Sequence, residues 1–505
     1  MSKSDTTFTI TIRATSIIID NGNEAMDFLE PLIENLTYED EYVEETKTLG
    51  WMYYKEKDLL FVHKGVDVNY LKKLLIYTDV KYDLGCKYKP MRFEYEEIIS
   101  PRNDEQVDVI DFIAGTGYHA TNINEPRLFL VKGTGFGKTY CSGVGICKYG
   151  TKTLIIMHRD SLRSQWLNSL YNMNGLSDEY VHEITSSEEF EMIAHNEHKY
   201  DYDVYLMTHA TFRSSIKRIR NLELIMKVPE NLGIGFKIID EAHLEFKDTL
   251  LIDFCFNIQR NLYVTATDGR SQRDENSIFK YVFSNVLYYK PSAMLTTNLP
   301  KKWVEYYAVE VNTNCKPNIY KYKVNGGRGM NPASYGKWVI QYDKKQRHFK
   351  CCKELVKEFY NRDQYAKIMI FMPLIDLCEE CAYFLNIELS KDKEFDFDLN
   401  IRTINSKNSP KDNEKAKSAD VIVTTIGSCG TGTDIPGITG IISCAPFVSK
   451  INAQQIFGRI RYCGKICQYY DIYDSSVQMD VFWHRSRCKK FKELALSFNK
   501  LTWSE

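Results

Sequence analysis

Short, continuous apolar runs alternate with stretches of helical periodicity over most of the chain. The first series lies at 127–131, 153–158, 204–208, 236–241 and 261–267. A second series of similar rhythm lies at 367–372, 401–405, 421–425, 440–445 and 469–474. Continuous runs rich in Val, Ile, Leu and Tyr suit parallel strands that are buried on both faces, with helices between them. The pattern therefore predicts two successive α/β sheets.

A different pattern precedes these runs. Residues 8–20 and 57–65 have the composition of strands, and residues 25–36 and 69–77 have the spacing of helices. This combination predicts a small α+β domain. It contains no constellation of catalytic type, so we expect either an accessory contact with DNA or a purely structural role.

These two patterns predict three domains. We place the small α+β domain at 1–92, the first α/β domain at 93–300 and the second, with a C-terminal helix, at 301–505. The Gly- and Asn-containing segment 324–337 is expected to be an exposed loop near the junction of the two large domains.

Composition narrows the class of protein only slightly. The chain has 505 residues, a formal net charge of -2 and 14 scattered cysteines. A near-neutral sum neither supports nor excludes a polyanionic partner, because it does not reveal a local basic groove. No apolar run is long enough to span a membrane, and the N-terminus lacks the apolar run of a signal peptide. We expect a cytoplasmic protein (in the host cytoplasm if viral) with reduced thiols rather than disulfides or zinc.

The clearest chemical signal is the segment GTGFGKT, which follows the run 127–131 and precedes a helical stretch. Its glycines allow backbone N–H groups to point at phosphates, and the helix N-terminus adds a positive dipole end. We expect Lys138 to reach the β- and γ-phosphates and the Thr139 hydroxyl to bind Mg²⁺. ATP and Mg²⁺ are therefore the expected cofactors, and the expected ATP-binding residues are Gly133, Thr134, Gly135, Phe136, Gly137, Lys138 and Thr139. Lys132 stands where the full phosphate-loop pattern has glycine.

Two adjacent carboxylates end the run 236–241. Asp240 is expected to hold Mg²⁺, and Glu241 to accept a proton from the attacking water as general base. A surface acidic turn is the weaker interpretation, because a largely apolar run leads directly into the pair. Burying two like charges is costly unless a cation is bound.

The second sheet offers arginines in the segment 454–461. An arginine that faces the γ-phosphate from the other domain stabilises charge in the transition state, an effect of about 10³ to 10⁵ in rate. Arg459 and Arg461 are the candidates, and a structural salt bridge is the alternative for either. Catalytic groups on two domains would make hydrolysis depend on domain closure.

These segments, in this order, resemble the superfamily 2 helicases over most of residues 95–475. The segment 133–139 resembles motif I, Asp240–His243 (DEAH) motif II and Thr265–Thr267 motif III. Further similarities are those of 154–166 to motif Ia, 207–212 to the next DNA-contacting motif, 367–385 to motif IV, 424–438 to motif V and 454–461 to motif VI. The resemblance implies two tandem RecA-like domains and a nucleic-acid-stimulated ATPase.

Within the superfamily, the chain looks most like the phage UvsW-type recombination helicases and the related poxvirus transcript-release helicase. That resemblance implies an ATP-dependent DNA helicase or translocase that remodels branched DNA by fork regression, junction migration or annealing, in recombination, repair or replication. The expected partner is branched DNA or a junction of single and double strands, bound by a monomer. An RNA helicase or transcript-release ATPase is the first alternative. An ATP-switched nucleic-acid clamp without unwinding is the second.

The resemblance also assigns roles to individual residues. Those expected to contact nucleic acid are Arg159, Ser161, Thr208, His209, Thr425 and Ser428. Those expected to couple ATP state to nucleic acid are His243, Thr265, Thr267, Gly432 and Asp434. Gln455 is expected at the nucleotide, and Gln106 either reads adenine or is an ordinary glutamine on a helix surface. The last arginine of motif VI, Arg461, comes one residue early for the family, so Arg459 is the preferred finger.

Overall fold

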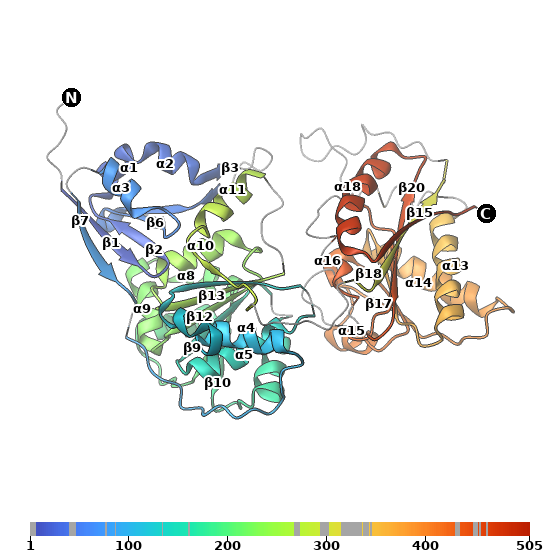
Figure 1. Cartoon of the computed structure of the whole chain (residues 1–505), viewed down its shortest axis with the longest axis horizontal. Helices are drawn as coiled ribbons and strands as arrows, with labels where there is room; N and C mark the ends of the chain where they lie inside the picture. The colour runs from blue at the N-terminus through green and yellow to red at the C-terminus, as the bar shows by residue number, and fades with distance from the viewer. Residues whose placement is uncertain are drawn as a thin grey trace. The chain divides into compact units, whose positions relative to one another are not determined.

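The computed structural model describes 7–39, 47–75, 78–85, 87–133, 135–159, 162–266, 273–292, 302–314, 336, 343, 346–429, 435–447, 453, 456–460 and 463–504. These residues form two compact units, one within 1–297 and one within 298–505. Figure 1 shows the two units, the first in blue to green and the second in yellow to red. Apart from Gly336, the expected loop 324–337 lies outside the described residues.

The first unit begins with a five-stranded sheet in the order β5-β6-β2-β1-β7. Its strands are β1 (Phe8–Arg13), β2 (Ser16–Ile19), β5 (Trp51–Tyr54), β6 (Leu59–His63) and β7 (Thr78–Asp83). Helices α1 (Gly22–Phe28), α2 (Glu30–Asn35) and α3 (Val68–Leu74) and the small pair β3 (Thr37–Glu39) and β4 (Lys47–Leu49) accompany it. The predicted small α+β region is therefore present.

Two elements of this region differ from the prediction. Residues 8–20 are not one strand but a hairpin, in which Ile10 pairs with Ile19 across an antiparallel ladder. The predicted helix 25–36 is interrupted at Leu29, where α1 ends and α2 begins. Pro31 lies in the first turn of α2, a position where proline is tolerated because no intrahelical N–H bond is lost.

The second sheet of this unit is parallel and has the order β10-β11-β9-β12-β13-β8-β14. Its strands are β8 (Arg127–Val131), β9 (Thr153–Met157), β10 (Val181–Ile184), β11 (Val204–Thr208), β12 (Phe236–Asp240), β13 (Arg260–Thr265) and β14 (Leu287–Tyr288). All five predicted strands are present. Strands β9, β11 and β12 are buried along their whole length, as central parallel strands with helices on both faces should be.

Helix α4 precedes these strands along the chain, and further helices follow them. They are α4 (Asp104–Ala114), α5 (Lys138–Tyr149), α6 (Arg163–Asn168), α7 (Ser187–Ala194), α8 (His209–Ile219), α9 (Leu222–Leu232), α10 (Phe246–Cys255) and α11 (Arg273–Val282). Apolar side chains on one face of the sheet, such as Leu130 and Ile238, pack with Val144 of α5 and Ile110 of α4. The carboxyl ends of β8, β12 and β13 therefore lie side by side at one edge of the sheet.

The second unit repeats this architecture with the order β17-β18-β16-β19-β20-β15-β21. Its strands are β15 (Val304–Val311), β16 (Ile368–Met372), β17 (Ile401–Ile404), β18 (Val421–Thr425), β19 (Gly440–Ser443), β20 (Cys467–Asp474) and β21 (Ser497–Thr502), all in parallel pairs. Its helices are α13 (Arg347–Arg362), α14 (Ile375–Ser390), α15 (Pro410–Ala416), α16 (Ile426–Cys429) and α18 (Gln478–Leu494). The fold is thus two tandem parallel α/β sheets preceded by a small α+β region, which confirms the predicted fold class.

A buried charge cluster joins the small sheet to the first parallel sheet. The Asp253 carboxylate lies 2.5 Å from Lys237 Nζ of β12, 3.0 Å from His63 Nε2 of β6 and 2.7 Å from the Tyr263 hydroxyl of β13. Its main-chain carbonyl accepts a bond of 2.7 Å from the Thr15 hydroxyl. Burial raises the pKa of Asp253, but Lys237 and His63 outweigh it and hold the pKa at about 2. The ionised carboxylate therefore ties β6 to the strands of the larger sheet.

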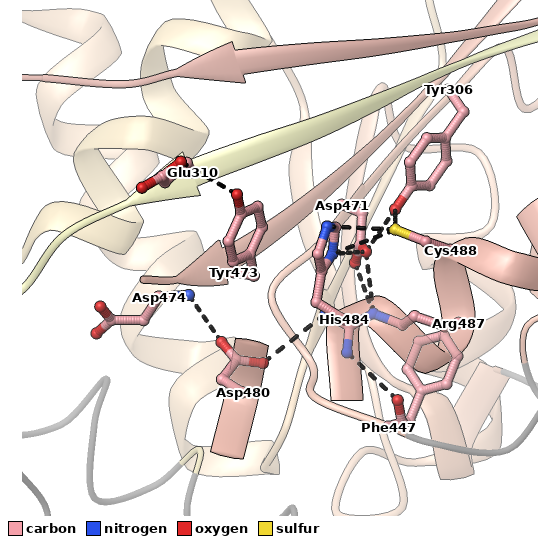
Figure 2. A network of polar contacts seen from close by, with 10 residues as sticks. All are labelled: Tyr306, Glu310, Phe447, Asp471, Tyr473, Asp474, Asp480, His484, Arg487 and Cys488. Carbon is pink, nitrogen blue, oxygen red and sulfur yellow. Dashed lines mark hydrogen bonds and ion pairs between the residues drawn. The ribbon is translucent and has the colours of Figure 1, made fainter. Parts of the chain in front are cut away.

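A second buried cluster fixes α18 to β20 in the other unit, as Figure 2 shows. Both Asp471 oxygens lie 3.0 Å from Arg487 Nε, and one lies 2.8 Å from His484 Nδ1 and 2.6 Å from the Tyr306 hydroxyl. Cys488 Sγ lies 3.2 Å from His484 Nε2. Arg487 balances the Asp471 carboxylate charge, and these hydrogen bonds tie α18 to β20 and β15.

This cluster predicts a loss of stability at alkaline pH. Burial lowers the pKa of His484, but Asp471 and Cys488 outweigh it and raise the pKa to about 9. Because the folded-state pKa exceeds that of a free histidine, the stabilisation is complete below about pH 6.5 and is lost as pH rises through about 9. It amounts to about 3 kcal/mol.

The test is urea unfolding of the wild type and of His484→Gln across this pH range. We expect the unfolding midpoint of the wild type to fall with rising pH and that of the variant to fall less. Equal pH slopes in the two proteins would refute the assignment.

Among the described helices, none combines the length and apolar character that crossing a membrane requires.

Candidate nucleotide site

The predicted phosphate loop joins the end of β8 to the start of α5. Gly135 and Gly137 have positive φ values of 82° and 95°, a region that glycine enters without strain. A Cβ at Gly137 would lie 2.6 Å from Gln106 Nε2, so a larger residue would displace its neighbours. A Cβ at Gly133, by contrast, would meet no heavy atom within 4 Å, and Thr134 lies outside the described residues.

Two side chains before and within α4 hold the carbonyl groups of this loop. Gln106 Nε2 donates to the Phe136 carbonyl at 2.6 Å, and the Arg102 guanidinium donates to the carbonyls of Gly135 and Phe136 at 3.1 and 2.7 Å. The Gln106 side-chain carbonyl accepts from the Arg102 N–H at 2.8 Å. These bonds anchor the carbonyls of Gly135 and Phe136 to Arg102 and Gln106. Gln106 is 1% exposed, so it is not a glutamine of a helix surface, and its adenine-reading role remains a prediction.

The lysine that replaces the first glycine of the pattern has its own partners. Lys132 Nζ lies 2.5 Å from Glu105 Oε1 and 4.6 Å from the centre of the Tyr289 ring. Its main-chain carbonyl accepts a bond of 3.0 Å from Lys138 Nζ. The Lys132 side chain is thus directed to α4. The Lys132 carbonyl holds the Lys138 ammonium at the phosphate loop.

The two predicted carboxylates meet at the carboxyl end of β12. Asp240 Oδ1 accepts from the Glu241 N–H at 3.0 Å, and Asp240 Oδ2 accepts from Trp166 Nε1 at 2.9 Å. Burial first, and then the neighbouring charge of Glu241, raise the pKa of Asp240 to about 6. Both effects favour a bound cation, because a cation would stabilise the ionised form.

Glu241 is oriented by the ends of β12 and β13. Its backbone has a φ of 51°, which is uncommon for a residue with a side chain. One carboxylate oxygen lies 3.3 Å from His243 Nδ1 and accepts from the Ala266 N–H at 3.4 Å. Burial raises the pKa of Glu241, but His243 and Lys138 outweigh it, and the pKa is lowered to about 2. Glu241 is therefore ionised, as a general base must be.

The predicted coupling residues of this unit contact one another. The Thr265 hydroxyl lies 2.7 Å from His243 Nδ1, the same nitrogen that faces Glu241. This chain of contacts joins the end of β13 to the carboxylate pair. Thr267, the other predicted residue of motif III, lies outside the described residues.

Residues that sequence reasoning missed complete the site. Trp166 and Gln165 of α6 contact Asp240 and Thr139, the latter through a bond of 3.3 Å from Gln165 Nε2 to the Thr139 hydroxyl. Arg102, which contacts the phosphate loop, is the third residue that was not predicted. Trp166 and Gln165 end the segment assigned to motif Ia, and Arg102 precedes Gln106 by four residues, so their places next to known motifs were the available signal.

The predicted nucleic-acid contacts of the first unit differ in exposure. Arg159 is exposed at the end of β9, and Ser161 lies outside the described residues. The Thr208 side chain is buried and caps α8 by accepting from the Thr211 N–H at 3.1 Å. His209 is 1% exposed, and burial lowers its pKa to about 3. In this conformation neither Thr208 nor His209 presents its side chain at the surface.

In the second unit, Thr425 and Ser428 lie at the carboxyl end of β18. The Thr425 hydroxyl accepts from the Ser428 N–H at 3.1 Å and lies 2.9 Å from the Ser428 hydroxyl. Arg459 lies in the described segment 456–460, and its side chain is buried. Gly432, Asp434, Gln455 and Arg461 lie outside the described residues.

The first unit's site suits a magnesium-bound nucleoside triphosphate. Such a ligand requires an ammonium, a hydroxyl at a helix N-terminus and a buried carboxylate. Burial disfavours the charge of that carboxylate, and a bound cation would compensate for it. Lys138, Thr139 and Asp240 would hold it, and the Glu241 carboxylate stands beside them.

Comparisons with known proteins concern the sequence of the first unit and the fold of the chain. Residues 99–269 match the family model of the type III restriction enzyme, res subunit. No curated protein matches the chain in sequence. Among solved structures, Dbp5 of S. cerevisiae bound to RNA and ADP BeF3 is 11% identical with a TM-score of 0.50, covering 79% of this chain and 90% of that one.

Two further solved structures are more distant in shape. UvsW of T4 is 14% identical, covers 99% of both chains and has a TM-score of 0.37. The Hef helicase domain of Pyrococcus furiosus is 15% identical, covers 73% of this chain and 96% of that one, and has a TM-score of 0.43.

The fold and the site define a class of protein, an ATPase of the helicase type built on two RecA-like domains. The segment that matches the family model, residues 99–269, contains the phosphate loop and the carboxylate pair of this site.

Proposed function

We propose that the chain is a motor that hydrolyses ATP to move along and remodel branched DNA. The observation that supports it most strongly is the arrangement around Glu241. An ionised carboxylate stands beside Asp240 and Lys138, and it is joined through His243 to Thr265 at the end of the next strand. A site built only to bind nucleotide has no need for an oriented, ionised base.

Each residue of the site is proposed to have a separate role in the reaction. Lys138 binds and neutralises the terminal phosphates, and Thr139 with Asp240 holds Mg²⁺, which supplies further charge neutralisation when bound. Glu241 accepts the proton of the attacking water. Thr265 and His243 sense the state of Glu241 and transmit it to the nucleic-acid contacts. Arg459 is the proposed arginine finger, the group that stabilises charge on the γ-phosphate in the transition state.

The contacts proposed with the polymer are directed at phosphates. Arg159 in the first unit, and Thr425 with Ser428 in the second, offer a guanidinium and hydroxyls rather than groups that read base edges. The family model at residues 99–269 bears the name of a restriction enzyme, which favours DNA over RNA as the polymer. Branched DNA is the proposed substrate.

Strand separation on matched forks tests this choice. Forks of identical sequence in DNA and in RNA should be compared at equal protein and ATP concentrations and over a range of salt. We expect the DNA fork to be unwound or regressed, the RNA fork to remain paired, and binding to weaken as salt rises. Preferential opening of the RNA fork would replace the DNA proposal with an RNA helicase. ATP-dependent binding without opening of either fork would indicate a clamp.

A further inference from the structure

Two cysteines face each other across the turn that leads from segment 456–460 into β20. Cys463 Sγ and Cys467 Sγ are 3.7 Å apart. Cys463 is exposed and Cys467 is buried. Of the cysteines within the described ranges, only Cys463 has an exposed side chain. The pair is therefore one accessible thiol with a second thiol directly behind it.

The turn is shaped and held by neighbouring groups. Gly464 has a φ of 84°, which lets the chain double back so that residues 463 and 467 approach. Lys465 Nζ forms an ion pair with Asp363 at the end of α13. The Cys467 N–H donates to the Trp303 carbonyl at 2.9 Å. The approach of the two sulfurs is thus part of a fixed turn.

We propose that Cys463 and Cys467 are a modification site at which hydrogen peroxide forms a reversible disulfide. A disulfide needs a sulfur–sulfur distance of about 2.05 Å, so the sulfurs must approach by less than the width of one atom. The turn already brings them together, and no strand has to separate.

The chemistry balances with peroxide as the only oxidant. The Cys463 sulfur, as thiolate, attacks one peroxide oxygen, so an S–O bond forms, the O–O bond breaks and the departing hydroxide becomes water on gaining a proton. The Cys467 sulfur then attacks the Cys463 sulfur. An S–S bond forms, the S–O bond breaks, and the second oxygen leaves as water with the proton of the Cys467 thiol. Two thiols are oxidised and one peroxide is reduced to two waters.

Access decides which of the two sulfurs reacts first. Burial raises the pKa of the Cys467 thiol to about 12, with a further contribution from Cys463, so Cys467 is a poor first nucleophile. Cys463 meets solvent directly. The order is therefore Cys463 as the attacking residue and Cys467 as the resolving one.

A second close pair in the same unit provides an internal comparison. Cys352 Sγ and Cys444 Sγ are 3.4 Å apart, closer than the proposed pair, but both side chains are buried in the core. If proximity alone governed oxidation, this pair would react at least as readily. If access is also required, it stays reduced while Cys463 and Cys467 are linked.

The turn lies next to the segment that carries Arg459. Trp303 contacts both ends of this region, because its indole Nε1 donates to the Ile460 carbonyl at 3.1 Å and its own carbonyl accepts from the Cys467 N–H. A disulfide would restrain the turn that follows this segment, and under the proposed function Arg459 takes part in ATP turnover. We therefore expect oxidation to reduce ATP turnover, an effect that rests on the proposed function.

The chemical part is tested on the full chain, treated with hydrogen peroxide, alkylated and digested with trypsin. We expect mass spectrometry to find peptide 462–465 linked to peptide 466–485 and dithiothreitol to release them, while peptides with Cys352 and Cys444 carry the alkylating label. The Cys467→Ser variant should instead retain a sulfenic acid at Cys463. Recovery of 462–465 in unlinked form from oxidised wild type, or preferential linkage of Cys352 to Cys444, would overturn the site.

The functional part is tested by phosphate release from the same samples. We expect turnover of the oxidised wild type to fall and to return with dithiothreitol, and turnover of Cys463→Ser to be unaffected by peroxide. Unchanged turnover in a fully linked sample would overturn the effect on Arg459. If the reduced protein itself released no phosphate, the proposed function would fail, whereas the peptide linkage would still decide the modification site.

Discussion

Replacing Lys138 by Ala abolishes ATP turnover in this account. Its ammonium stands at the mouth of the phosphate loop, held 3.0 Å from the Lys132 carbonyl. Removing it leaves the terminal phosphates without their nearest cation, and the loss of one such preorganised group costs about 10²- to 10³-fold or more in rate. Phosphate release at saturating ATP is the measurement.

Lys148→Ala is the matched control for this substitution. Lys148 lies near the other end of the same helix and is exposed. We expect its turnover to equal that of the wild type, which separates loss of the phosphate contact from a general effect on α5. Normal turnover in the Lys138→Ala protein would show that the loop does not bind the reacting phosphates.

Glu241→Gln is expected to retain ATP binding and to stop hydrolysis. The amide has nearly the size of the carboxylate, so Asp240 and Lys138 keep their places, but the amide cannot accept a proton from water. Equilibrium binding of a fluorescent ATP analogue and single-turnover hydrolysis, measured on the same preparation, distinguish the two effects. We expect similar affinity and a rate at least about 10²-fold lower.

The control here is Glu245→Gln. Glu245 follows the same strand but is exposed and pairs with Arg213 at 2.8 Å. Loss of that surface pair should leave hydrolysis near the wild-type rate. Hydrolysis by Glu241→Gln at the rate of the Glu245→Gln control would remove Glu241 from the role of general base.

The parallel sheets and the order of the motifs could be predicted because each depends on residues that are adjacent in sequence. A continuous apolar run such as 153–158 requires burial on both faces, and a glycine turn directly after such a run has few other uses. The hairpin at residues 8–20 was not predicted because an apolar run has the same sequence pattern whether it forms one strand or folds back into two. No turn residue such as Gly or Asn marks the reversal at Ala14 and Thr15.

The groups that brace the site were beyond prediction for a different reason. Trp166 contacts Asp240 from 74 positions away in sequence, and Arg102 contacts Phe136 from 34 positions away. No spacing rule relates such pairs, because the fold alone brings them together. The burial of Thr208 and His209 could not be predicted either. A threonine that caps its own helix and a threonine that contacts a ligand have the same sequence pattern.

The most direct test of the central claim is steady-state phosphate release by the purified chain with and without a DNA fork. The proposed coupling of the carboxylate pair to polymer contacts through His243 and Thr265 predicts many turnovers per molecule and a marked rise when the fork is added. A rate that neither forked DNA, single-stranded DNA nor RNA alters would contradict the claim that this ATPase is a nucleic-acid motor.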